Sequence, residues 1–148
     1  MNTKETVQSL MDAVQMGDFK KAKSYLSNDF EFSGPVPQPI SGDEWMGLSA
    51  NLKAAFPDLN YQFKIVSVDG DTANITAQLR GTHKGDLDLT AMHMGVIPAT
   101  RKSFNAALEH GKVRVRNEKI TSLMNEPTEG AGLMAILDQL GVKVPHAA

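Results

Sequence analysis

The sequence has 148 residues, the length of a single domain, and its apolar fraction of 41% is ordinary for a globular protein. Lys and Arg together number 15 and Asp and Glu 17, and the resulting net charge of -2 provides no basic field for binding nucleic acid. The absence of cysteine excludes disulfides, thiolate metal sites and a cysteine nucleophile.

Two helices are predicted at the N-terminus. Asn2 and Glu5 have the spacing of a capping box that begins the first helix. Gly17 is suited to end this helix. The apolar residues of this segment recur at helical spacing: Val7, Leu10, Met11 and Val14. Asp18 can cap a second, short helix, whose apolar face is formed by Phe19, Ala22, Tyr25 and Leu26.

A short strand at residues 30–32 is followed by a loop at 34–39, which contains three prolines. Ser41 and Glu44 form a second capping box and begin a third helix, which Pro57 ends. The apolar stripe of this helix is made of Trp45, Leu48, Leu52 and Phe56.

The middle of the chain predicts strands. Apolar residues alternate over 59–65 and again over 73–81, with a hairpin turn at 69–71. The pattern is lost over 84–102, which we interpret as a long loop or a bulged strand.

Alternation resumes over 104–108, but Val113 and Val115 are out of phase with it, which predicts a bulge near Gly111. The last strand is expected from Ile120 to Met124, and a final helix over 133–140. Helices followed by a meander of strands predict an α+β fold with an antiparallel sheet. If the sheet curves around the helices, it forms a cone whose open end is a ligand pocket.

Four segments resemble the SnoaL-like polyketide cyclases, also called ester cyclases, of the NTF2-like superfamily: residues 56–59, 81–85, 94–100 and 137–141. The Gly-Thr-His-Lys-Gly run at 81–85 and the Gln-Leu-Gly run at 139–141 are the most specific of them. The resemblance covers nearly the whole chain and implies the NTF2-like cone, with a curved antiparallel sheet packed against about three helices around an apolar cavity.

The resemblance also implies a chemistry. Enzymes of the family close a ring by intramolecular aldol condensation without a metal or an organic cofactor, so we expect neither here. Their acid–base group is an aspartate near the end of the last strand, a few residues after a Lys-Ile pair. Lys119 and Ile120 match that pair, and Thr128 then stands where the family has its aspartate.

Two residues are therefore candidates for the catalytic role, His83 and Glu126. By strand parity His83 shares the face of Leu79 and Gly81, where it could transfer protons at the mouth of the cavity. Glu126 shares the parity of Met124, and an inward carboxyl group would have a raised pKa.

Each candidate has a structural alternative. His83 could be bonded to a backbone carbonyl, and Glu126 could be a solvated residue at a strand end. Glu129 is a weaker candidate that is more simply explained as a helix cap.

The expected ligand-binding residues are apolar: Phe32, Trp45, Leu79, Phe104 and Met124. Each of these side chains could equally belong to the hydrophobic core without contacting a ligand. The histidines at 83, 93 and 110 lack the spacing of metal ligands, so no metal site is predicted.

Two classes of function remain open at this point. The first is an enzyme that performs acid–base catalysis on an apolar carbonyl compound, of the cyclase or isomerase type. The alternative is a non-catalytic module for ligand binding or dimerisation. Epoxide hydrolysis and ketosteroid isomerisation also occur in the superfamily, but Arg80 is expected outside the cavity and neither Tyr25 nor Tyr61 is clearly placed.

The expected partners are a small apolar ligand and a second copy of the chain. Leu123, Val66 and Val68 are predicted on the outer face of the sheet, where apolar side chains favour a homodimer. The chain shows neither the apolar run of a signal peptide nor the roughly 20 apolar residues of a membrane span. We therefore expect one domain over residues 1–148, located in the cytoplasm and without nucleic-acid or membrane partners.

Overall fold

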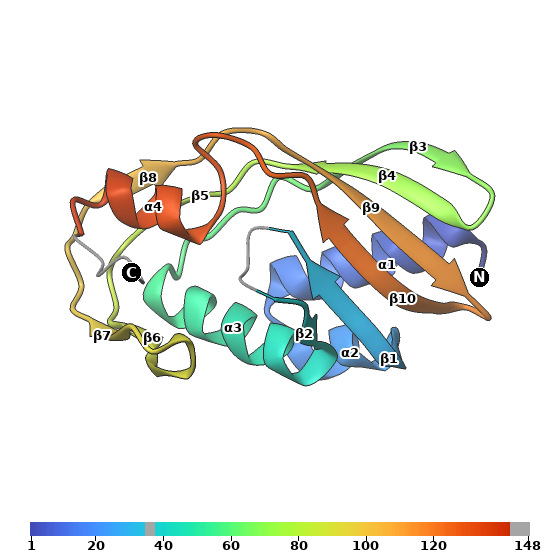
Figure 1. The fold of residues 1–148 in the computed structure, drawn as a ribbon, viewed down its shortest axis with the longest axis horizontal. Coiled ribbons are helices and arrows are strands. Elements are labelled where there is room, and N and C mark those ends of the chain that lie inside the picture. Colours follow the sequence, from blue (N-terminus) through green and yellow to red (C-terminus); the bar gives the residue numbers. More distant parts are fainter. Residues whose placement is uncertain (35–37, 143–148) are drawn as a thin grey trace.

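A computed structural model describes residues 1–34 and 38–142 of the chain (Figure 1). The helices are α1 (Thr3–Met16), α2 (Phe19–Ser24), α3 (Gly42–Ala55) and α4 (Leu133–Gln139), with a 3₁₀ turn η1 (Thr90–Met92). The strands are β1 (Leu26–Ser33), β2 (Ile40–Ser41), β3 (Lys64–Asp69), β4 (Thr72–Ala77), β5 (Arg80–Thr82), β6 (Leu87–Leu89), β7 (Gly95–Ile97), β8 (Ser103–Asn105), β9 (Glu109–Arg116) and β10 (Lys119–Asn125). The proline-rich loop expected at 34–39 lies partly outside the described residues.

Both predicted capping boxes are present. The Asn2 side chain accepts from the backbone N–H of Glu5, and the Ser41 hydroxyl accepts from that of Glu44, while each glutamate bonds back to its cap. The apolar stripe of α1 is buried and packs against β3, β4, β9 and β10. No helix in the described part of the chain is both long and apolar enough to cross a membrane.

The main sheet has the strand order β2-β1-β10-β9-β4-β3. It is curved and does not close into a barrel, and helices α1 to α3 lie along one of its sides (Figure 1). Its pairs are antiparallel, as expected, except that β1 runs parallel to β10. The predicted α+β class and curved sheet are confirmed.

A bulge in β10 changes which of its residues face the core. Ile120 pairs with Val115, but Ser122 pairs with Arg114, so one extra residue lies between them. Beyond the bulge Leu123 is buried, whereas Met124 is 55% exposed. The prediction that Met124 faces inward and Leu123 outward is therefore wrong, because one inserted residue exchanges the two faces of a strand.

Strand β9 is regular where a bulge was expected. Its register with β4 runs without a break from Thr72↔Arg114 to Ala77↔Glu109, so there is no bulge at Gly111. The phase change instead falls in the segment between β8 and β9. As a result Glu109, Gly111 and the two following valines all face the inside of the sheet.

The segment 84–102 contains a small hairpin of β6 and β7, joined through η1. Leu87 and Leu89 are buried, and β6 packs against α3. The Asn51 amide of α3 donates to the backbone carbonyl of Asp88, at 3.1 Å. This hairpin places Met92 beside the cavity described next.

Candidate functional site

An apolar cavity lies between the inner face of the sheet and helices α3 and α4, with η1 at its side, and has a volume of about 110 Å³. Most of its wall is apolar. Four polar side chains also reach it: Ser49, Tyr61, Glu109 and Asn125. A mostly apolar cavity with a few polar groups is the usual form of a small-molecule site.

Aromatic rings form one wall. Trp45 of α3 stacks on both Phe30 and Phe32 of β1, with ring centroids 5.3 Å and 5.5 Å away. Tyr61 stacks on Phe63 at 4.8 Å. These contacts hold Trp45 and Tyr61 in fixed orientations beside the cavity.

Glu109 is the buried carboxyl group of the cavity. It begins β9, lines the cavity wall and is only 6% exposed. Burial raises its pKa above the ordinary value, and the backbone N–H of Gly132 acts more weakly in the opposite direction. The ion pairs among the described residues are Met1–Glu118 and Lys23–Asp43, so no cation compensates its charge.

Tyr61 provides a buried hydroxyl group. Its oxygen has no hydrogen-bond partner in the structure as described. Burial raises the pKa of Tyr61 to about 12, so the phenol stays protonated at neutral pH. The nearby Ser49 hydroxyl opposes this effect weakly, but it does not meet the geometry of a hydrogen bond to the Tyr61 oxygen. Gln15 fixes the backbone here, because it accepts from the N–H of Tyr61 at 2.8 Å and donates to the carbonyl of Leu59 at 2.9 Å.

Asn125 reaches the cavity at the end of β10, where it pairs with Gly111 of β9. A Cβ atom at Gly111 would lie 2.6 Å from the Oδ1 atom of Asn125. Only a residue without a side chain therefore allows the Asn125 amide to lie over β9.

Helix α4 contributes Leu133 and Ile136 to the cavity wall. It is anchored to β8 through Gln139, whose side chain accepts from the N–H of Asn105 at 2.8 Å and donates to its carbonyl at 3.0 Å. Gln139 belongs to the C-terminal Gln-Leu-Gly run, so that run has a structural role in holding the helix.

Comparison with protein families supports the resemblance. The model of the SnoaL-like polyketide cyclases matches residues 4–128. The chain belongs to this family. A search of curated proteins gives no match.

Solved structures share the fold of this SnoaL-like protein. A proposed SnoaL-like polyketide cyclase from Jannaschia sp. CCS1 has a TM-score of 0.73 at 18% identity, over 95% of this chain and 92% of that one. IdmH from Streptomyces antibioticus, a proposed polyketide cyclase, has a TM-score of 0.71 at 21% identity, over 96% and 100%. A protein from Catenulispora acidiphila with a ketosteroid isomerase-like fold, in complex with trimethylamine, has a TM-score of 0.65 at 20% identity, over 94% of both chains.

Three of the expected lining residues of this SnoaL-like chain do lie in the cavity wall: Phe32, Trp45 and Leu79. Phe104 is buried elsewhere and packs edge-on against Phe56, with ring centroids 4.9 Å apart. Met124 lies outside the wall because of the bulge in β10.

His83 is buried away from the cavity wall. Its Nδ1 atom accepts from the backbone N–H of Thr100 at 3.1 Å and lies 3.0 Å from the Thr100 hydroxyl, and its ring packs edge-on against Phe56. Burial lowers its pKa, which favours the neutral form of the ring. The parity argument that placed His83 in the wall fails because β4 ends at Ala77 and β5 pairs with β8 in a separate sheet.

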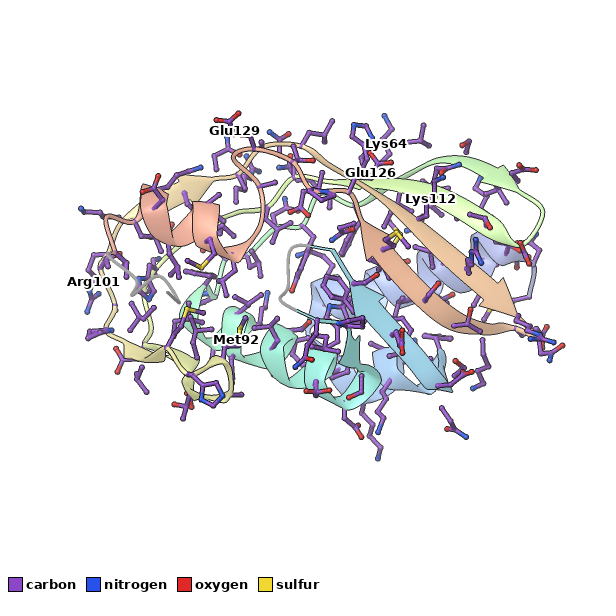
Figure 2. All side chains as sticks on the ribbon, viewed as in Figure 1. Lys64, Met92, Arg101, Lys112, Glu126 and Glu129 are labelled. Carbon is purple, nitrogen blue, oxygen red and sulfur yellow. The ribbon has the colours of Figure 1, made fainter. Side chains whose placement is uncertain are left out.

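Glu126 is exposed just beyond the end of β10, and its backbone N–H donates to the carbonyl of His110 at 2.8 Å. Figure 2 shows Glu126 and Glu129 on the same side of the view as Lys64 and Lys112, away from Met92 of the cavity wall. The geometry matches the solvated alternative for Glu126. Thr128 donates from its hydroxyl to the carbonyl of Glu126 at 3.2 Å and does not line the cavity.

No cluster of three or more His, Asp or Glu side chains suited to a metal ion occurs within residues 1–34 and 38–142. Of the polar groups in the cavity, Ser49, Glu109 and Asn125 were not predicted from the sequence, and Tyr61 was considered there without a position. Glu109 lies on the same face of β9 as Val113 and Val115. The alternation of β9 would therefore have placed it inside, had the change of phase been assigned to the segment before this strand. Asn125 could not be found by parity, because the bulge near Thr121 has no sequence signature.

Proposed function

We propose that this SnoaL-like protein binds a small apolar organic molecule in its cavity and transfers a proton at a carbon next to a carbonyl group, with Glu109 as the acid–base group. The observation that carries the proposal is the buried Glu109 carboxyl group, which has a raised pKa and no cation to pair with. A carboxyl group of this kind is expensive to keep in a cavity, and such groups concentrate at functional sites.

The raised pKa makes Glu109 a stronger base than an exposed glutamate. General acid–base groups work best when their pKa lies near the working pH. Its carboxylate would take the proton from the α-carbon of a bound ketone, and the electron pair of the C–H bond would move onto the carbonyl oxygen. The surrounding apolar wall strengthens electrostatic interactions with the charge that develops there.

Tyr61 is suited to stabilise that oxygen. Its hydroxyl lacks a partner and, with a pKa of about 12, keeps its proton, so it can donate a hydrogen bond to an enolate. A phenol that donates to the oxygen while a carboxyl group moves the proton is also the arrangement in ketosteroid isomerase.

The enolate has two outcomes that fit the family. Return of the proton from Glu109 to a different carbon gives isomerisation. Attack of the enolate carbon on a second carbonyl group gives ring closure, and the new alkoxide then takes the proton from Glu109. Both begin with the same α-proton transfer, so this first step is the one to measure.

The test follows the exchange of the α-protons of cyclohexanone for deuterium in D₂O by NMR. Wild-type protein is expected to accelerate the exchange, and E109Q to slow it by about 10²–10⁴-fold, the usual size of a general acid–base contribution. E126Q is the matched control, because Glu126 is a carboxylate outside the cavity, and it should exchange like wild type. Equal rates for wild type and E109Q would contradict the proposal.

A further inference from the structure

We infer that the substrate is a carbonyl compound the size of a single ring, and not a fused polycyclic molecule. The inference rests on the proposed function for its chemistry and on the shape of the cavity for its size. It specifies a substrate class smaller than the name polyketide cyclase suggests.

The cavity volume sets the upper limit. It is about 110 Å³, whereas an engineered apolar protein cavity that admits one benzene molecule measures about 150 Å³. A one-ring ketone therefore fills this space fully. A molecule of three fused rings would need the wall to move, and displacing packed side chains is costly.

Half of the residues that line the cavity are buried in the protein core, and these cannot easily move. Trp45 stacks on two phenylalanines, and Ile136 and Leu123 are almost fully buried. Enlarging the cavity through these residues would disrupt the packing of α3, α4 and β10.

Leu133 is one of the half-buried residues of the wall, and it stands at the first position of α4. Its truncation enlarges the cavity without removing a residue from the centre of the core. Met134 follows it in the same helix, is exposed and does not line the cavity. The pair thus provides a variant that changes the volume and a control that does not.

The experiment compares three ketones: cyclohexanone with one ring, β-tetralone with two and tetrahydrophenanthrenone with three. The catalysed rate of deuterium exchange of each ketone is divided by its uncatalysed rate. Binding is measured by the quenching of the fluorescence of Trp45, which is the one tryptophan of the chain and lines the cavity. Wild type should prefer cyclohexanone over β-tetralone by about tenfold or more and leave the three-ring ketone unbound, because each misfitting carbon costs about tenfold or more.

L133A should move the preference toward β-tetralone by about tenfold, and M134A should keep that of wild type. If L133A does not give a cooperative thermal transition, L133V replaces it and should shift the preference in the same direction.

The outcomes separate the size of the substrate from the chemistry. Tight binding or fast exchange of the three-ring ketone by wild type overturns the inference and leaves the proposed function in place. Exchange that does not depend on Glu109 overturns the proposed function. The affinities of the three ketones, measured by quenching of Trp45 fluorescence, then still decide the size of the ligand.

Discussion

Glu109 shows how one residue can work against stability and for chemistry. Its folded-state pKa lies above the ordinary value of 4.5 because the charged form is poorly solvated in the cavity wall. Below that value the group is protonated in both the folded and the unfolded state. As the pH rises, the unfolded state loses its proton first, so the free energy of unfolding falls until the folded-state pKa has been passed.

E109Q removes this titration and keeps the shape of the side chain. We expect its melting temperature to exceed that of wild type at about pH 7 and the difference to shrink towards about pH 4, because the penalty for the charge disappears there. Thermal unfolding followed by circular dichroism across this range checks it. A melting temperature of E109Q at or below that of wild type at neutral pH would show that the carboxylate is well stabilised.

Tyr61 leads to a second prediction at the same scale. A buried hydroxyl without a partner costs about 1–3 kcal/mol, so Y61F should leave the free energy of unfolding unchanged or raise it. Loss of one donor to the enolate should nevertheless slow the exchange of ketone protons by about 10²-fold. Urea unfolding and the NMR exchange assay measure the two effects. A stability loss with full activity would mean that the hydroxyl is structural.

At the scale of elements, the sequence predicted what depends on neighbours in the chain. The two capping boxes lie within single helical turns, so α1 and α3 were expected with nearly the bounds they have. Inward and outward faces of strands depend on register over long distances. Because of the bulge in β10, the prediction placed Met124 on the wrong face and did not find Asn125. Because the chain changes sheet at β5, the prediction for His83 was also wrong.

The contact between β9 and β10 supports a prediction of its own. G111A brings a methyl group within 2.6 Å of the Asn125 Oδ1 atom, so the variant should lose about 1–3 kcal/mol of stability through overpacking. In the double variant G111A/N125A the clashing oxygen is gone, and part of the loss should return. Urea denaturation of the wild type, both single variants and the double variant gives the coupling energy. Additive losses would show that the side chain of Asn125 moves aside freely.

At the scale of the whole molecule, the homodimer stays a prediction with a corrected surface. Leu123 no longer supports it, because that side chain is buried in the core. Val66 and Val68 remain, 61% and 41% exposed, and Met124 joins the exposed apolar residues at 55%. Analytical ultracentrifugation at micromolar concentration should show a dimer that V66D weakens, since burial of a charge without a partner opposes association. A monomer at every concentration rules the dimer out.

The position of α1 has a consequence for synthesis in the cell. Its apolar stripe is covered by β3, β4, β9 and β10, which begin at residue 64 and end at residue 125. Because the ribosome delivers the chain from the N-terminus, α1 emerges long before the strands that shelter it. During that interval the stripe of the nascent chain lacks the four strands that cover it, and uncovered apolar surface of this kind promotes aggregation and recruits chaperones.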